Sequence, residues 1–132
     1  MRPAISGGLV FFYYYGIEDA SRFYGDTMGF DLKLDREWVN IYKISQDSHI
    51  GLVDASRGSH KPSEEKPVRL QVMVDDADAW FKYLKEKGVD IPRKEPKVGE
   101  TLRIKAFTVL DPGGYSVEIC EYITPYGVRL TE

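Results

Sequence analysis

The feature that most constrains the fold is a weak internal repeat, in which two helix-like stretches end at glycines 59 positions apart. The two stretches read EDASRFYGDTMGFD and ADAWFKYLKEKGVD. This offset aligns Gly29 with Gly88, Tyr24 with Tyr83 and Asp31 with Asp90. A repeat of this size indicates two copies of one structural unit. The alternative is a chance similarity within an ordinary α+β domain.

Each half of the chain reads as a strand, a helix and further strands. Apolar residues recur at three- and four-residue steps over 17–28 and 77–84, which predicts one helix in each half, ended by its glycine. Strand-like runs precede the helices at 9–15 and 68–74, and β-type segments follow at 31–33, 37–44, 50–53, 102–110 and 115–121. We therefore predict an α+β fold of two repeated βαβββ modules in a single domain. Module one spans about 8–56, a polar linker 57–67, module two 68–122 and a C-terminal tail 123–132.

Composition excludes several classes of function. The 18 basic and 21 acidic side chains give a net charge of −3, so neither a nucleic-acid nor a membrane-surface partner is expected. The longest apolar run, Leu9 to Tyr15, is far shorter than the roughly 20 residues of a membrane span. A single cysteine, Cys120, excludes an intrachain disulfide and a cysteine-rich zinc site. The N-terminal MRPAISGG has no apolar stretch typical of a signal peptide, and the expected location is cytoplasmic.

Three stretches resemble the vicinal-oxygen-chelate superfamily of glyoxalases, bleomycin-resistance proteins and extradiol dioxygenases. They are ASRFYGDTMGF, VMVDDADAWFKYLKEKGV and VLDPGGYSVEICE. They are similar to the family's first helix with its glycine-phenylalanine end, its aspartate-led second helix and its aspartate-proline-glycine hairpin. The resemblance implies two modules whose sheets form a cup-shaped mixed sheet around a small ligand. It also implies assembly as a homodimer.

In metal-dependent members of this family, four strands supply the ligands. On the last strand of module two, the matching residue here is Glu118. The other three strands offer Arg69 or Gln71, Val10 or Phe12, and Gly51 with His49 two residues earlier. Catalytic metals take about three or more protein ligands. The resemblance therefore predicts a degenerate site, in which a divalent metal, if bound, would be held by Glu118, His49 and Gln71.

Glu118 is also a candidate from the residues alone. If Leu110 and Tyr115 pair across the turn DPGG, Phe107 faces Glu118 and Lys105 faces Cys120. A slip of one residue in this register would exchange the two faces. A partly desolvated Glu118 would act as an acid or base in catalysis, whereas the structural alternative is an ion pair with Arg103 or Lys105. The residues predicted to line this face of the cup are Arg103, Lys105, Phe107 and Glu118.

Other polar strand residues are candidates for ligand binding. Arg69 and Gln71 lie on one face of an apolar strand and need partners, because unpaired buried polar groups cost a few kcal/mol. A bound anionic or carbonyl ligand, or a salt bridge with Glu118, would supply them. His49 is the only histidine in a predicted strand, and a structural role remains the alternative. Trp38 either lines the cup or packs in the core.

The aromatic run FFYYYG forms the opening strand of module one. The 59-residue offset places Phe12 opposite Gln71 in the repeat, so Val10, Phe12 and Tyr14 are predicted to face the cup. Phe11, Tyr13 and Tyr15 are then expected to pack on the helices. Hydrocarbon at Val10 and Phe12 would leave this strand without a metal ligand.

The favoured function is binding of a small aromatic or carbonyl-containing ligand without a cofactor. The first alternative is a metal-dependent enzyme (a lyase, isomerase or dioxygenase) that chelates vicinal oxygens through a divalent metal. The second alternative is a dimerising module without a small ligand. Fold alone does not distinguish these three.

Overall fold

The computed structural model describes residues 1–92, 95–99 and 103–123. The chain divides into two compact units, Met1–Glu65 (unit 1) and Lys66–Glu132 (unit 2), and the boundary falls within the predicted linker. All but the first residue of the predicted tail 123–132 lie outside the described residues. No helix in the described ranges is long and apolar enough to cross a membrane.

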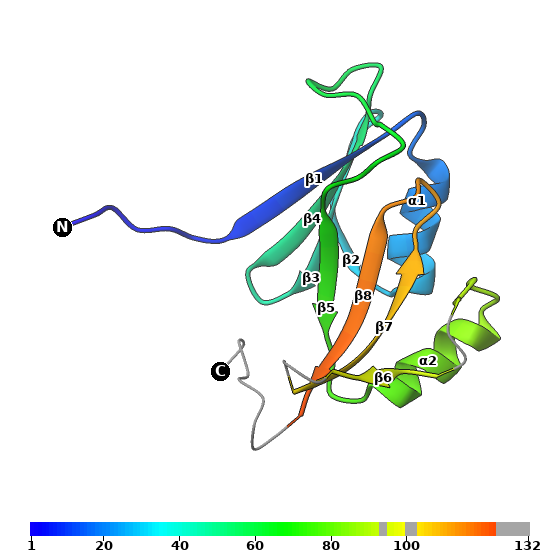
Figure 1. The fold of residues 1–132 in the computed structure, drawn as a ribbon. Coiled ribbons are helices and arrows are strands. Elements are labelled where there is room, and N and C mark those ends of the chain that lie inside the picture. Colours follow the sequence, from blue (N-terminus) through cyan, green and yellow to red (C-terminus); the bar gives the residue numbers. More distant parts are fainter. Residues whose placement is uncertain (93–94, 100–102, 124–132) are drawn as a thin grey trace. The chain divides into compact units, whose positions relative to one another are not determined.

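Unit 1 consists of a four-stranded sheet and one helical segment (Figure 1). Its elements are β1 (Gly8–Tyr14), α1 (Glu18–Arg22), the π-helical turn η1 (Phe23–Thr27), β2 (Asp31–Asp35), β3 (Val39–Ser45) and β4 (Ser48–Asp54). The strand order is β1-β4-β3-β2, in which β1 runs parallel to β4 and the other pairs are antiparallel. A strand, a helix and three further strands therefore form one mixed sheet.

Unit 2 repeats this topology. Its elements are β5 (Arg69–Met73), α2 (Ala77–Glu86), β6 (Lys97–Val98), β7 (Ile104–Leu110) and β8 (Ser116–Tyr122). The strand order is β5-β8-β7-β6, with β5 parallel to β8. The predicted α+β class with two repeated βαβββ modules is confirmed. The short strand β6 has no counterpart among the predicted segments.

The core of unit 1 lies between its sheet and its helix. The Tyr42 hydroxyl donates a hydrogen bond to the Ser21 carbonyl on α1 at 3.2 Å, which identifies the face of the sheet that the helix covers. Ile50 pairs with Tyr42 and lies on the same face. Large side chains on this face and on the helix are fully buried: Phe12, Tyr24, Ile50 and Leu52.

Unit 2 is built in the same way around α2. The Phe107 ring packs edge-to-face on Phe81 of the helix, with 5.2 Å between ring centroids. The Asp76 carboxylate accepts a hydrogen bond from the Ala79 N–H, and that of Glu121 accepts one from the Ala77 N–H, both at 3.0 Å. These acidic groups satisfy free N–H groups at the start of the helix. The core residues beneath it are Val72, Leu84, Phe107, Val109, Val117 and Ile119.

The π-helical turn η1 adds one residue to the first helix. Its defining hydrogen bond runs from the Met28 N–H to the Phe23 carbonyl, five residues back, at 2.8 Å. As far as the second residue of this turn, the two units match at an offset of 60: Ile17 and Ala77 are both buried, as are Tyr24 and Leu84. After it, Gly29 and Gly88 match at 59, and both have positive φ, 76° and 80°. The helix-ending role predicted for these glycines agrees with this left-handed conformation.

The extra residue reverses the faces of β1, and the prediction for this strand was wrong. Phe12 and Tyr14 are 1% and 5% exposed and lie on the helix-covered face, not on the open one. Phe11 and Tyr13 line the open face instead. Because side chains alternate along a strand, an offset error of one residue exchanges the two faces. Tyr15, expected to pack on a helix, is 77% exposed.

The register of the β7–β8 hairpin also differs from the prediction by one residue. Leu110 pairs with Ser116, not Tyr115, because Asp111 and Tyr115 close the turn themselves through an N–H to carbonyl bond of 2.8 Å. The buried Asp111 carboxylate accepts the N–H groups of Gly113 and Tyr115, both at 2.9 Å. Gly114 supplies the positive φ of a three-residue hairpin loop. Phe107 and Lys105 consequently lie on the face opposite to Glu118.

Candidate functional site

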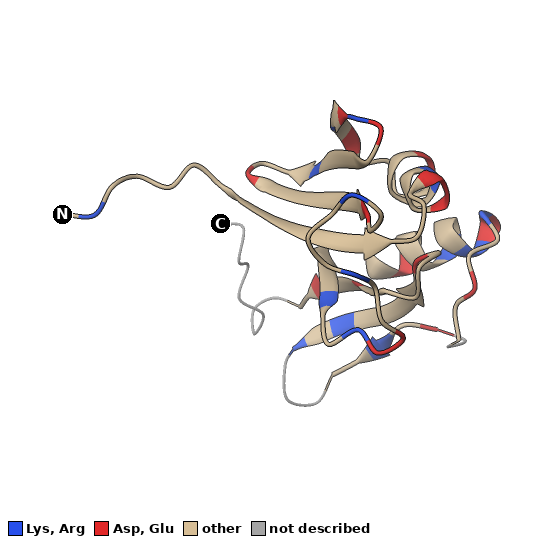
Figure 2. Cartoon of the chain, turned by 90° about the horizontal axis from the view of Figure 1, so that it is seen from above, with Lys and Arg blue, Asp and Glu red and all other residues tan. Residues whose placement is uncertain are grey.

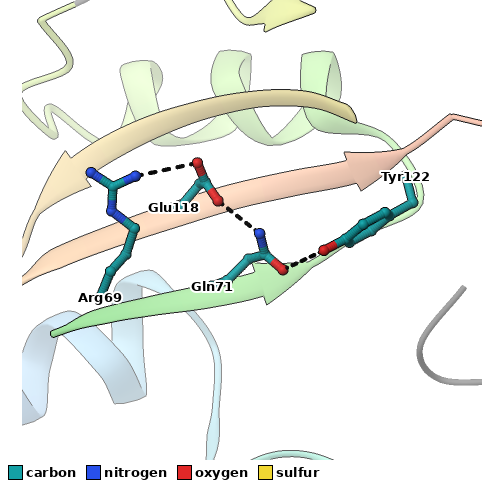
Figure 3. A network of polar contacts seen from close by, with 4 residues as sticks. All are labelled: Arg69, Gln71, Glu118 and Tyr122. Carbon is teal, nitrogen blue, oxygen red and sulfur yellow. Dashed lines mark hydrogen bonds and ion pairs between the residues drawn. The ribbon is translucent and has the colours of Figure 1, made fainter. Parts of the chain in front are cut away.

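The open face of unit 2 carries a continuous polar network on β5 and β8. Gln71 pairs with Glu118 in the register, so their side chains share a face. The Gln71 amide donates to the Glu118 carboxylate at 2.7 Å, and the Arg69 guanidinium lies 3.5 Å from the other carboxylate oxygen. The Tyr122 hydroxyl donates to the Gln71 amide oxygen at 2.9 Å (Figure 3). Of the two partners that the sequence suggested for Arg69, a bound ligand or Glu118, the structure contains the salt bridge with Glu118.

Burial distinguishes the members of this network. The Glu118 side chain is only 17% exposed, whereas that of Arg69 is 54% exposed. A largely buried carboxylate is stabilised by hydrogen-bond donors, and here the Gln71 amide and the Arg69 guanidinium are those donors. The guanidinium keeps much of its surface in solvent, where its remaining N–H groups are able to reach a ligand.

A hollow of about 470 Å³ lies beside the network, within the range of small-molecule sites. Its charged lining groups are Arg69, Lys97 and Glu118, which gives two cations against one carboxylate. The other lining residues are Gly99, Ile104, Ala106, Phe107 and Thr108. The hollow therefore offers an oxygen-rich ligand more positive than negative charge.

The remaining residues predicted for this site lie elsewhere in unit 2. Lys105 forms an ion pair with Asp78 of α2, and this hydrogen bond raises the Lys105 pKa. Phe107 borders the hollow, but its ring packs on Phe81. Arg103 precedes β7, and its carbonyl accepts the Ile123 N–H at 2.8 Å. Glu118 thus pairs with Arg69, and the predicted pairing with Arg103 or Lys105 is wrong.

Cys120 follows Glu118 on β8 and is fully buried. Burial, and then the charges of Glu118 and Glu121, raise the pKa of its thiol to about 11. A thiol with this pKa remains protonated at neutral pH and is a poor nucleophile or metal ligand.

In unit 1, a phenylalanine and a glycine occupy the positions that match Gln71 and Glu118. Phe11 pairs with Gly51, and the offset of 60 that holds before η1 carries Phe11 to Gln71. A Cβ atom added to Gly51 would lie 2.4 Å from the Phe11 ring, so the ring covers the glycine. His49 pairs with Leu9 on the same open face and is partly exposed.

A second hollow, of about 430 Å³, lies on the open face of unit 1 and is mainly apolar. Trp38 lines it, whereas Tyr42, four residues later, is buried against α1. Burial also raises the pKa of the Tyr42 hydroxyl. The hollow is bordered by Phe11, Tyr13, Leu34, Trp38, Val39, Ile41, Val53, Arg57, Gly58 and Ser59.

The donors available for a metal are unevenly distributed between the units. Unit 2 offers the Gln71 amide and the Glu118 carboxylate side by side, and unit 1 offers the imidazole of His49. In the parts of the chain that the structure describes, no three His, Cys, Asp or Glu side chains form a cluster suited to a metal. The equivalent pair in unit 1, Phe11 and Gly51, has no donor side chain.

Sequence reasoning missed several residues that border the two sites. Tyr122 lies at an even spacing from Glu118 on the same strand, and this alternation was a usable signal. Lys97 lies on a two-residue strand that gives no periodic pattern. Arg57 and Ser59 fall in the segment assigned to the linker, and no pattern in the sequence places them on the sheet.

Comparison with known proteins supports the fold. Residues 10–119 match the sequence model of the Glyoxalase/Bleomycin resistance protein/Dioxygenase superfamily. A glyoxalase/bleomycin resistance protein/dioxygenase from Nocardioides is similar, with a TM-score of 0.74 and 16% identity over 98% of this chain and 89% of that one. A lactoylglutathione lyase from Agrobacterium tumefaciens has a TM-score of 0.72 and 18% identity, over 91% and 96% of the two chains. TioX from a Micromonospora species has a TM-score of 0.70 and 17% identity, over 89% and 99%. No curated protein matches significantly.

Proposed function

Because the chain belongs to the Glyoxalase/Bleomycin resistance protein/Dioxygenase superfamily, we propose that it binds a small aromatic or carbonyl-containing ligand without a resident metal. The proposal extends to assembly as a homodimer and to a cytoplasmic location. Ligand oxygens are recognised on the open face of unit 2, at the hollow beside Arg69 and Glu118.

The observation that carries this proposal is the contrast between two matching residue pairs. In unit 2 the pair is Gln71 and Glu118, and in unit 1 it is Phe11 and Gly51. A ring that lies over a glycine provides no oxygen, nitrogen or sulfur atom for a metal, and it occupies the space of a replacement side chain. The two positions of unit 1 that match Gln71 and Glu118 therefore carry no donor atoms for a metal.

Arg69 supplies the charge that a metal would otherwise provide. Its guanidinium neutralises Glu118 and retains exposed N–H groups beside the hollow. Arginine donates in a planar fork suited to carboxylate and carbonyl oxygens. Lys97 adds a second cation to the same hollow. A ligand with one or two adjacent oxygens matches these donors.

One observation favours a second candidate function, a metal-dependent enzyme. The Gln71 amide and Glu118 carboxylate lie 2.7 Å apart, and a small rotation of each would present two oxygens to one cation. A lyase, isomerase or dioxygenase reaction would then be possible in chemical terms, because a bound cation polarises carbonyl oxygens.

Metal analysis and ligand-induced stabilisation distinguish the two functions. We expect purified protein to carry no more divalent metal than Glu118→Ala, and an aromatic carbonyl or carboxylate compound at 100 times its Kd to raise the Tm by about 5 to 10 °C. Arg69→Gln should lose most of that shift, because its charged donors are removed. The exposed Arg22, on α1, gives the matched control Arg22→Gln. Stoichiometric metal that disappears in Glu118→Ala would support the enzyme instead, and a broad compound panel without any shift would reject the binding function.

A further inference from the structure

Residues 57–59 of unit 1, expected to be part of a solvated linker, lie against the sheet. The Asp54 carbonyl accepts the N–H groups of Arg57 and Gly58, and its carboxylate accepts that of Ser56, all at 3.0 Å. The hydrogen bond from the Ser56 N–H to the Asp54 carboxylate holds the Asp54 pKa below its usual value. A short turn therefore fixes the segment at the end of β4.

A glycine allows this close approach. A Cβ atom added to Gly58 would lie 2.6 Å from Val53 and 3.2 Å from the Tyr13 ring. Beyond it, the Ser59 hydroxyl lies 2.7 Å from the His60 ring nitrogen, and the His60 ring lies 5.1 Å from that of Tyr13. The segment forms one edge of the apolar hollow of unit 1, and the rest is formed by Trp38 and by aromatic and aliphatic side chains of the sheet.

The hollow combines flat apolar walls with one cation. Phe11, Tyr13 and Trp38 contribute rings, and the volume of about 430 Å³ is within the range of small-molecule sites. Aromatic walls favour a planar ligand, because offset and edge-to-face ring contacts add to the apolar area that is buried.

Among the described residues that border this hollow, Arg57 is the only charged one. Its guanidinium carbon lies 5.7 Å from the centre of the Trp38 ring. Its ion pair with Glu37 is long, at 4.0 Å, and both side chains are mostly exposed, so it contributes little. The guanidinium therefore remains able to form a close, bidentate pair with an anion that enters the hollow.

We infer that the unit 1 hollow binds a flat aromatic carboxylic acid, with its ring between the aromatic walls and its carboxylate on Arg57. This inference goes beyond the proposed function, because it adds a second site, on unit 1, to the one proposed beside Arg69 on unit 2. Apolar walls alone would accept neutral and anionic rings alike. Arg57 at the edge favours the acid over a neutral ring, because only the carboxylate of the acid forms a charge-assisted hydrogen bond with the guanidinium.

The chain provides its own reporter for this hollow. It has two tryptophans, Trp38 in the hollow and Trp80 on α2, so Trp80→Phe leaves Trp38 as the only indole. We would titrate this full-length variant with 4-nitrobenzoate and with 4-nitrobenzamide, two flat quenchers that differ in charge. The acid should quench Trp38 saturably and bind at least tenfold more tightly than the amide, which corresponds to about 1.4 kcal/mol.

Substitution of Arg57 tests the assigned role. Arg57→Gln should weaken acid binding about tenfold or more and change amide binding less than about threefold, whereas Arg57→Lys should retain part of the preference. Arg36→Gln, which removes another exposed arginine of unit 1, should change neither. Circular dichroism checks that each variant is folded.

Failure of the inference is distinguishable from failure of the proposed function. Equal binding of acid and amide, unaffected by Arg57→Gln, would overturn the inference while aromatic binding stands. Acid binding that leaves Trp38 unquenched and is lost in Arg69→Gln would move the site to unit 2 and also overturn it. If no compound in the melting panel binds, both fall.

Discussion

At the scale of single residues, the polar network was predictable and its exact partners were not. An arginine and a glutamine on an apolar strand required an acceptor, and Glu118 provides one for both. Buried polar groups of this kind are costly when unpaired, so both side chains must have partners. The sequence does not indicate which of the neighbouring charges is the partner. That depends on the register, which a single residue cannot report.

Cys120 leads to a pH-dependent prediction. The unfolded thiol has a pKa of about 8.5, whereas burial raises the folded pKa to about 11. A raised folded pKa means that the unfolded state ionises first. The stabilisation is therefore complete below the unfolded pKa and is lost as pH rises through the folded one. We expect the free energy of unfolding to fall by about 2 to 3 kcal/mol from this group between pH 8.5 and 11.

Urea denaturation of the wild type and Cys120→Ala at several pH values measures this contribution. Lysine and tyrosine side chains also titrate in the window, and they are common to both proteins. The difference in slope therefore belongs to the thiol. Parallel pH profiles would show that Cys120 ionises normally in the folded protein and would contradict the burial seen here.

At the scale of elements, the helices and their glycine stops were predictable because both signals are local. Residue spacing and a positive-φ glycine need no knowledge of the rest of the fold. The two errors were one-residue shifts, the first from an extra residue in the helix and the second from a hairpin loop one residue shorter than assumed. The turn η1 lengthens the first helix, and Asp111 with Tyr115 adds a pair to the hairpin. Either change exchanges the faces of a strand, so element types were recovered while the faces of β1 and β7 were not.

The turn η1 packs closely against β3, which predicts an unfavourable Gly25→Ala substitution. Alanine generally stabilises a helix by up to about 1 kcal/mol relative to glycine. Here its Cβ would lie 3.1 Å from the ring and hydroxyl of Tyr42. That side chain is 5% exposed and bonded to the Ser21 carbonyl, so it has little room to move. We expect a net loss of about 1 kcal/mol, since overpacking costs about 1 to 3.

A double-mutant cycle with Tyr42→Phe isolates the contact. Tyr42→Phe alone should destabilise by about 1 kcal/mol through the lost hydrogen bond. In that background Gly25→Ala should be less harmful, because the hydroxyl is absent and the ring is free to shift. A higher Tm for Gly25→Ala in the wild-type background would mean that helix propensity outweighs the contact.

At the scale of the whole molecule, composition predicted the character of the surface. Acidic and basic residues occur along both units, and both signs are present on the helices (Figure 2), as expected from 18 basic and 21 acidic side chains. Which strand faces remain open was not predictable, because it depends on the extra residue in η1 and on the length of the β7–β8 loop. The open faces carry both hollows, and so the candidate sites could be located only approximately from the sequence.

Exposed apolar side chains on the strands of both units predict self-association. Val10, Phe11 and Leu32 of unit 1 are 53%, 45% and 46% exposed. Val98 and Leu110 of unit 2 are 50% and 59% exposed. Exposed apolar surface of this kind marks interaction sites, and two-fold symmetric dimers are the commonest assemblies.

We therefore expect sedimentation and light scattering to give twice the 15.1 kDa mass of one chain. A lysine at a buried interface position leaves a charge without solvent, so Val10→Lys or Leu110→Lys should shift the equilibrium toward monomer. Glu86→Lys, on the exposed surface near the end of α2, changes charge without removing apolar area and should leave the mass unchanged. A monomer mass for the wild type at every concentration would contradict the dimer. Aromatic-acid binding by that monomer would further show that each chain carries a complete site.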